Sequence, residues 1–100
     1  MRRHKYNAIS VESDGIRFDS KKEARYYDEL KLRVKSGEIV FFLRQTPFHL
    51  PGSVRYVVDF QEFHADGTIH FIDVKGMETP EFKRNKKMVE NLYPVTIEVK

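Results

Sequence analysis

The sequence predicts a single α/β domain in which a mixed β-sheet is flanked by helices and preceded by a short β-hairpin. Amphipathic segments that carry helix-capping residues alternate with short runs rich in Val, Ile, Tyr and Phe. Gly, Pro and Asp residues separate these runs, as they do at turns. Hydrophobic residues make up 40% of the 100 residues, which is enough for one packed core, and no repeat or linker divides the chain.

The predicted domain has three parts. Its first residues are basic, and Ser13-Asp14-Gly15 between Ile9–Val11 and Ile16–Phe18 indicates a hairpin. The next part begins with a helix-capping motif at Ser20 and contains all the longer apolar runs. The parts of this single domain, which spans 1–100, are a basic arm at 1–8, a hairpin at 9–19 and a core at 20–100.

The core begins with a helix. Ser20 and Glu23 form a Ser-x-x-Glu capping box, which satisfies the free backbone N–H groups of a first helical turn. The helix is expected to continue to about Ser36, where Gly37 supplies the left-handed residue that ends it.

Three strands, a second helix and a last strand complete the core. Pro47 and Pro51-Gly52 are expected to separate the first strand from the second, and Asp66-Gly67 forms the next turn. Thr79-Pro80-Glu81 combines a cap, a first-turn proline and a first-turn acid, which predicts the second helix, and Pro94 ends it. The predicted segments are strands Ile39–Arg44, Val54–His64 and Ile69–Lys75, a helix to about Leu92, and a strand Val95–Val99.

Composition narrows the function classes. The chain has no cysteine, which excludes a disulfide framework, thiolate zinc sites and cysteine nucleophiles. No apolar run approaches the ~20 residues that span a bilayer, and no signal peptide opens the chain, so we expect a cytoplasmic protein without membrane contact. The net charge of +3 is mild, but basic residues cluster in two places. The candidates for contact with DNA phosphates, with a plain solvated surface as the alternative, are Arg2, Arg3, Lys5, Lys83, Lys86 and Lys87.

Asp73 lies in an apolar run, Ile69–Lys75, whose hydrophobic residues occur on both faces. This pattern predicts an interior strand covered on both sides, where an uncompensated carboxylate would be costly. Lys75 follows at a spacing of two, so the strand period places both side chains on one face. An Asp–Lys contact at a strand end is one explanation, and an active site is the other.

Asp59 is a second carboxylate in an apolar strand. If residues 65–67 form a three-residue loop with Gly67 in the left-handed conformation, the register places Asp59 opposite Asp73. A two-residue turn would instead put Asp59 on the other face. Two facing carboxylates repel each other unless a cation or a shared proton lies between them, so this register predicts a divalent metal ion.

Glu23 is the third acid. It shares one helical stripe with Tyr27, Leu30 and Val34, which would face the core. An acid on an inward stripe needs a partner. Glu23 is therefore expected either to bind a metal ion or to serve only the helix cap.

A metal site would combine these acids. Three oxygen donors suit Mg²⁺ or Mn²⁺, and we expect the ion between Asp59, Asp73 and the Val74 carbonyl, with Glu23 bound directly or through water. There it would polarise a phosphate and lower the pKa of a bound water. Lys75 would position that water or stabilise the charge of the transition state. The expected catalytic residues are Glu23, Asp59, Asp73 and Lys75.

These residues resemble the signature of the PD-(D/E)XK nucleases. Asp59 matches the first acid of that signature, Asp73-Val74-Lys75 matches its Asp-x-Lys, and Glu23 matches an acid often found on the preceding helix. Val58 stands where the signature has proline. The resemblance implies a restriction-endonuclease-like core of helix, three strands, helix and strand, which is the order predicted for residues 20–99.

The resemblance covers nearly the whole chain. The stretches Lys5–Ala8, Asp14–Ala24 and Asp73–Gly76 are similar to small phage-encoded proteins of this superfamily. The spacing of the acids also resembles junction-resolving enzymes and the endonuclease subunit of some transposons. These relatives imply Mg²⁺-dependent DNA cleavage, and the resolvases imply a homodimer. Gln45 resembles a polar residue that some members place near the site, although a glutamine at a strand end can equally cap a loop.

Three functions follow from these observations. The first is a DNA endonuclease that acts on branched, nicked or structured DNA, because the chain has no room for a separate sequence-reading domain. The second is a non-catalytic DNA-binding module that keeps the nuclease fold. The third is a nuclease subunit that is active only inside a larger recombination or packaging complex, with a phage or recombination protein as partner.

Overall fold

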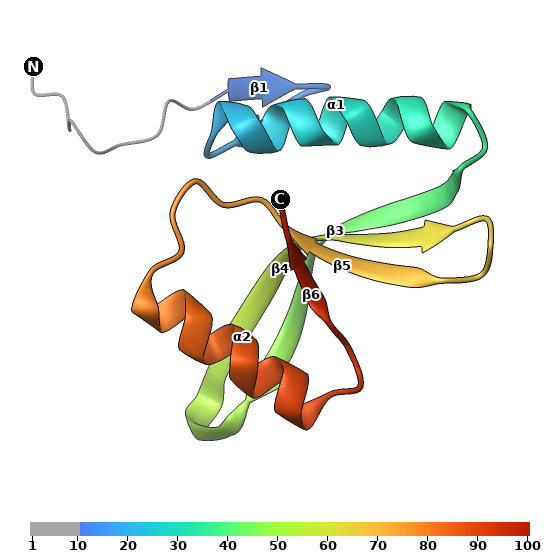
Figure 1. The fold of residues 1–100 in the computed structure, drawn as a ribbon. Helices are drawn as coiled ribbons and strands as arrows, with labels where there is room; N and C mark the ends of the chain where they lie inside the picture. The colour runs from blue at the N-terminus through green and yellow to red at the C-terminus, as the bar shows by residue number, and fades with distance from the viewer. Residues whose placement is uncertain (1–10) are drawn as a thin grey trace, which may run out of the picture.

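The computed structural model describes residues 11–100 as an α/β fold with a two-stranded hairpin sheet and a four-stranded mixed sheet (Figure 1). After the hairpin, the order of elements is helix, three strands, helix and strand, as the sequence predicts. No helix within this part of the chain is long and apolar enough to cross a membrane. The elements are β1 (Val11–Ser13), β2 (Ile16–Phe18), α1 (Lys21–Lys35), β3 (Ile39–Leu50), a 3₁₀ turn (Pro51–Ser53), β4 (Val54–His64), β5 (Ile69–Asp73), α2 (Pro80–Leu92) and β6 (Ile97–Val99).

The hairpin and α1 form where their turn and capping residues predict them. β1 and β2 are antiparallel and are joined by Asp14-Gly15, which both have positive φ as a two-residue hairpin turn requires. The expected first strand also included residues 9–10, which lie outside the described residues. The backbone N of Glu23 donates to Ser20 Oγ at 3.1 Å, so the predicted N-cap is confirmed.

The main sheet has the strand order β3-β4-β5-β6. The pairs β3–β4 and β4–β5 are antiparallel, whereas β5 and β6 are parallel. β5 is therefore an interior strand, as its apolar pattern predicts. Its two faces support different cores, because Ile72 packs with α1 and Phe71 packs with the residues around α2.

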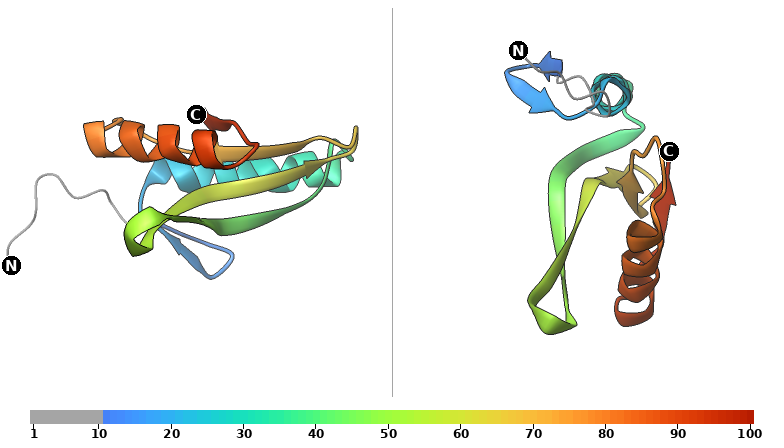
Figure 2. Two further views of the ribbon diagram at one scale, coloured as in Figure 1. Left: turned by 90° about the horizontal axis from the view of Figure 1, so that it is seen from below. Right: turned by 90° about the vertical axis from the view of Figure 1, so that its left-hand side faces the viewer.

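β3 is longer than the sequence predicts. We expected it to end near Arg44 because Pro47 breaks the apolar run, but the strand continues through Pro47 to Leu50. The reason is that β3 lies at the edge of the sheet, where one side of the strand has no neighbour to receive the N–H that proline lacks. The extended β3–β4 hairpin consequently runs from α1 at one end of the molecule to α2 at the other (Figure 2).

β5 and β6 are shorter than predicted. β5 ends at Asp73 instead of Lys75, and β6 begins at Ile97 instead of Val95. The backbone N of Val74 leaves the ladder because it bonds to a side chain, the carboxylate of Asp59.

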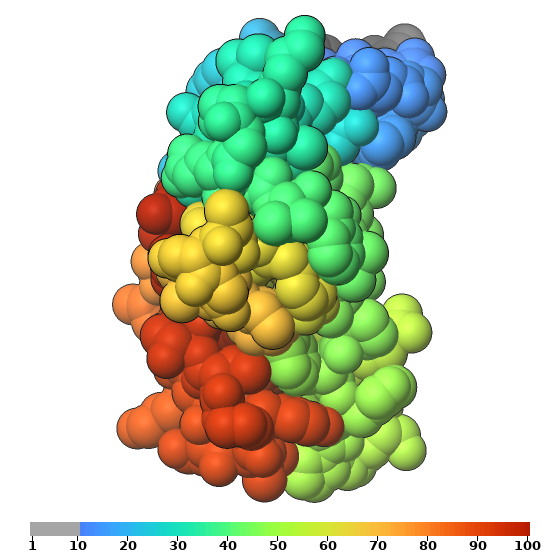
Figure 3. Space-filling model, turned by 90° about the vertical axis from the view of Figure 1, so that its right-hand side faces the viewer, coloured from blue at the N-terminus to red at the C-terminus, as the bar shows by residue number. Residues whose placement is uncertain are grey.

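Two hydrophobic clusters share the β3–β4 hairpin. The α1 core and the α2 core lie towards opposite ends of the molecule, and Figure 3 shows the end of the β4–β5 hairpin, in yellow, at the surface between the two helices. Each large side chain buried in these cores contributes about 1.5–3 kcal/mol. The buried members are Phe18, Ala24, Tyr27, Leu30, Ile39, Phe60, Ile72 and Val74 in the α1 core and Phe48, Leu50, Tyr56, Val58, Val89 and Ile97 in the α2 core.

Candidate metal and active site

The loop between β4 and β5 sets the register of the two central strands. Gly67 has a φ of +92°, and the backbone N of His64 donates to Thr68 O at 2.9 Å. The three-residue loop predicted from the sequence is thus confirmed. Continued by one step beyond its last pair, the β4–β5 ladder brings Asp59 across from Asp73.

The two acids are held by reciprocal bonds to each other's strand. The backbone N of Asp59 donates to Asp73 Oδ1 at 3.0 Å, and the backbone N of Val74 donates to Asp59 Oδ2 at 2.8 Å. The Tyr56 hydroxyl donates to Asp73 Oδ2. Asp73 is only 1% exposed. These bonds fix both carboxylates at one point of the sheet.

The electrostatics of Asp59 reflect this crowding. The pKa of Asp59 is raised to about 6, mainly by burial and also by the nearby charge of Asp73. The Val74 N–H and the Lys75 ammonium oppose this rise in pKa, because both stabilise the ionised form. Asp59 and Asp73 are therefore close enough to repel each other, as their facing positions predict.

α1 brings Glu23 to the same place. Lys22 Nζ donates to Lys75 O at 3.0 Å, which ties the start of α1 to the segment after β5. Glu23 is 8% exposed, and while its backbone N bonds to the Ser20 cap, its carboxylate accepts no hydrogen bond from residues 11–100. The pKa of Glu23 is raised to about 7, and the largest cause is burial, with repulsion from Asp59 as the second. Glu23 is thus a buried acid without a bonded partner.

Lys75 lies beside these acids. Its Nζ is 4.9 Å from the centroid of the Phe82 ring on α2, a favourable cation–π contact. The charge of Lys75 also lowers the pKa of both Glu23 and Asp59. The fold consequently brings together the four expected catalytic residues from α1, β4, β5 and the segment after β5.

Gln45 lies on β3, on the far side of Asp59 from Asp73. The flanking pairs Arg44–Phe60 and Thr46–Val58 place Gln45 opposite Asp59 in the β3–β4 register. Its φ of +56° is left-handed, a conformation that is strained for a residue with a side chain. The residue is exposed. Its position is next to the acids, where the resemblance implies a polar residue.

Two further residues of this region were not foreseen from the sequence. Burial and the bond to Asp73 raise the pKa of Tyr56, so its hydroxyl stays protonated and acts as a donor. Arg44 is half-buried on β3, and its charge lowers the pKa of Glu23. The only sequence signal for Arg44 is its place in an alternating strand, between the inward-facing Phe42 and Thr46.

The structure describes some of the basic residues that were predicted to contact DNA phosphates. On α2, Lys83 and Lys87 are exposed, whereas Lys86 Nζ pairs with Glu90 Oε2 at 3.2 Å. The three predicted contacts in the basic arm lie outside the described residues; these are Arg2, Arg3 and Lys5.

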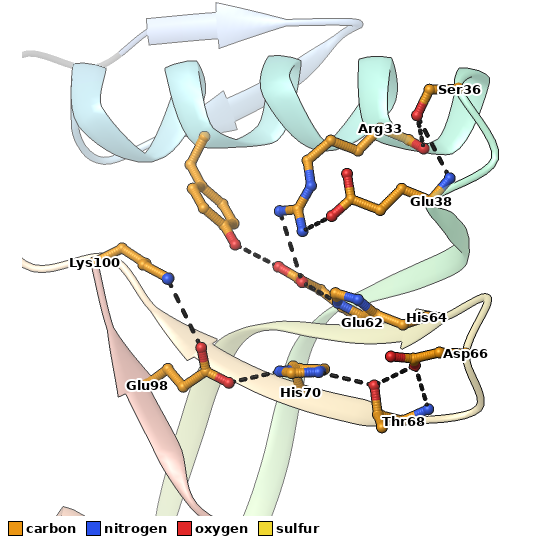
Figure 4. Close-up of polar contacts among 11 residues, drawn as sticks. Arg33, Ser36, Glu38, Glu62, His64, Asp66, Thr68, His70, Glu98 and Lys100 are labelled. Carbon is orange, nitrogen blue, oxygen red and sulfur yellow. Dashed lines mark hydrogen bonds and ion pairs between the residues drawn. The ribbon is translucent and has the colours of Figure 1, made fainter.

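A second buried acid, Glu62, lies on β4 under α1 (Figure 4). Glu62 is 1% exposed, and it accepts a hydrogen bond from the Tyr26 hydroxyl. His64 Nε2 lies 2.9 Å from its Oε1, and Arg33 Nη1 lies 3.9 Å from the same oxygen. We refer to Glu62, Tyr26, His64 and Arg33 as the Glu62 network. Both carboxylate oxygens of Glu62 therefore have a partner.

The oxygen donors at Asp59, Asp73 and Glu23 are the type that Mg²⁺ and Mn²⁺ prefer. In residues 11–100, however, no group of three or more acidic or histidine side chains is arranged to hold a metal ion. The argument that a metal ion fits here rests instead on the raised pKa values of two of these acids. Burial and mutual repulsion raise the pKa of both Asp59 and Glu23, and a divalent cation would relieve both costs.

Comparison with known proteins places this geometry in a family. Residues 3–99 match the family described as "Protein of unknown function (DUF1064)". The chain belongs to this family. No curated protein and no solved structure matches the chain significantly. Because the match covers α1, β4 and β5 in full, the candidate site lies entirely within the DUF1064 domain.

Proposed function

We propose that this DUF1064 chain is a metal-dependent DNA endonuclease that hydrolyses phosphodiester bonds in branched, nicked or otherwise structured DNA. The observation that carries the proposal is the convergence of Asp59, Asp73 and Lys75 with Glu23, a buried acid whose carboxylate accepts no hydrogen bond from residues 11–100. A purely structural sheet has no use for such a set, because uncompensated buried acids destabilise it. The order of helix, three strands, helix and strand supports a restriction-endonuclease-like core.

The residues have distinct roles in this proposal. A Mg²⁺ or Mn²⁺ ion held by Asp59, Asp73 and the Val74 carbonyl, with Glu23 bound directly or through water, would polarise the scissile phosphate and lower the pKa of a water molecule. Lys75 orients the attacking water and stabilises the extra negative charge of the transition state. Tyr56 holds the Asp73 carboxylate in place through its hydroxyl.

The class of DNA substrate is proposed from the small size of the domain. One domain of 100 residues leaves little surface for reading bases, so DNA shape and phosphate position would select the site of cleavage. We propose that the chain acts as a homodimer in the cytoplasm, so that two sites can cut two strands of one branched molecule.

The test is cleavage by the purified chain. A four-way junction, a nicked duplex and a linear duplex are each incubated with Mg²⁺ or Mn²⁺, and the products are separated on denaturing gels. We expect cleavage of the structured substrates, none in EDTA, and a loss of roughly 10²–10³-fold in Asp73→Asn and in Lys75→Met. Glu29→Gln is the matched control, because it removes an exposed carboxylate from the same helix as Glu23.

Two other results would each contradict the proposal. Binding of DNA in EDTA that Asp73→Asn leaves unchanged, without cleavage in either metal, would identify a non-catalytic binding module. Cleavage only after the addition of recombination or packaging proteins would identify a subunit of a larger complex.

A further inference from the structure

Arg44 acts on Glu23 only at a distance, because its charge lowers the pKa of that acid without an ion pair between the two side chains. Its Nε is enclosed and has no hydrogen-bond partner, and it forms no ion pair within the described part of the chain. Arg33 is different, because its Nη2 bonds to Glu38 Oε2 at 2.7 Å. A half-buried guanidinium without an anion is costly, since it has lost water without gaining a partner. Such a group is suited to an anion that arrives with a ligand.

The position of Arg44 indicates which anion this is. Its Cζ lies 4.7 Å from the centroid of the Phe18 ring, which is itself 1% exposed, so the guanidinium is stacked on a rigid surface. On β3 it pairs with Phe60, the residue next to Asp59. Arg44 therefore lies beside the acids, over the Phe18 ring, and its Nε has no hydrogen-bond partner among residues 11–100.

The geometry points to Arg44 as a ligand for a phosphate of the DNA backbone beside the metal site, an inference that rests on the proposed nuclease function. A planar guanidinium presents parallel N–H donors that match two phosphate oxygens, which an ammonium group does not. The bound phosphate would supply the anion that Arg44 lacks. It would also fix the position of the DNA strand relative to Asp59 and Asp73.

The experiment measures DNA binding in EDTA at several salt concentrations, by fluorescence anisotropy. Each phosphate contact contributes about 0.9 to the slope of log K against log salt for duplex DNA, so Arg44→Met is expected to lower the magnitude of the slope by about that amount. The control is Arg55→Met, which removes the same charge from an exposed position at the far end of the β3–β4 hairpin. In Mg²⁺, Arg44→Met is also expected to lower kcat/KM for cleavage by roughly 10–100-fold.

The slope separates this inference from the nuclease proposal. A folded Arg44→Met variant with the wild-type slope would overturn the inference, even if cleavage falls, because Arg44 would then act only through its neighbours. A lowered slope in a protein that cuts no DNA would support Arg44 as a phosphate ligand and contradict the nuclease. If Arg44→Met does not fold, Arg44→Gln replaces it, because glutamine keeps a polar group and removes the charge, and the same change in slope is expected.

Discussion

Glu23 on α1 and Glu62 on β4 are both buried glutamates between the helix and the sheet, yet their surroundings are opposite. Glu62 is 1% exposed and has a tyrosine hydroxyl, a histidine and an arginine around its carboxylate. Glu23 is 8% exposed, and no side chain or backbone group of residues 11–100 donates a hydrogen bond to its carboxylate. Burial alone therefore does not mark a functional acid in this fold. A buried acid with missing partners does.

The arginines of the two regions repeat the contrast. Arg33 is bonded to Glu38 and lies within 3.9 Å of Glu62, whereas the Nε of Arg44 has no hydrogen-bond partner within the described residues 11–100. The Glu62 network thus fastens α1 to the sheet through Tyr26 and Arg33. Near the start of α1, Glu23 and Arg44 of β3 have opposite charges and form no ion pair within residues 11–100, which is the arrangement expected of a site that binds both a cation and a phosphate.

The largest effect on stability is expected from the Glu62 network. Replacing Glu62 by Gln removes one member of a buried charged network, and we expect it to lower the free energy of unfolding by about 3 kcal/mol. Glu23→Gln is the matched substitution, and in metal-free buffer at pH 8 it is expected to leave the free energy of unfolding unchanged or raise it. Urea denaturation followed by circular dichroism measures both.

The effect of the same two substitutions on DNA cleavage is expected to be the reverse of their effect on stability. Glu23→Gln lowers the rate, by roughly 10–100-fold if it holds the metal through water, while folded Glu62→Gln keeps the wild-type rate. The comparison would fail if Glu23→Gln were the more destabilising of the two, because Glu23 would then be a structural acid.

The next effect concerns pH. The pKa of Glu23 rises from an ordinary value of 4.5 to about 7, and that of Asp59 from 3.8 to about 6. Because the folded state holds these protons more tightly than the unfolded state, their contribution is fully present below about pH 4 and is lost as the pH rises through 6 and 7. Between pH 5 and pH 8 these shifts correspond to a loss of about 4 kcal/mol for the metal-free protein, which solvent screening of the acids reduces to about 2–3 kcal/mol.

Divalent cations should reverse this loss. At pH 8, Mg²⁺ or Mn²⁺ at about ten times its dissociation constant is expected to restore about 1.4 kcal/mol, and less at pH 5, where protons compete for the same oxygens. The variant Glu23→Gln should flatten the pH dependence. Equal stabilisation by Mg²⁺ at both pH values would contradict binding at these carboxylates.

The placement of Asp59 opposite Asp73 could be predicted from the sequence because register in a hairpin follows from the loop. Gly67 in the left-handed conformation indicates a three-residue loop, and only this loop sets a register in which Asp59 faces Asp73. The strand period then places both side chains on one face. The N-cap at Ser20 was equally local. Where the prediction was wrong, at Pro47, the missing information was that β3 is an edge strand, which depends on the order of strands in the finished sheet.

Arg44 and Tyr56 could not be found by the same reasoning. The Tyr56 hydroxyl reaches Asp73 from the α2 core, and no spacing rule links these two residues of different strands. Arg44 is recognisable only by the absence of a partner, which becomes visible once every neighbouring carboxylate has been placed. Local patterns therefore identify the acids, and tertiary structure identifies the residues that surround them.

The smallest effect separates a tyrosine that positions an acid from one that only supports the fold. Tyr56→Phe removes the hydroxyl that bonds to Asp73, and Tyr93→Phe removes one that donates to His49 O at 2.7 Å, also around the α2 core. Each is expected to lower the free energy of unfolding by about 1 kcal/mol, measured by urea denaturation. Only Tyr56→Phe is expected to slow cleavage, by about tenfold in kcat with little change in KM, because Asp73 loses a fixed orientation and the DNA contacts remain. Equal cleavage by the two variants would mean that the reciprocal bonds between Asp59, Asp73 and Val74 hold the acids without help from Tyr56.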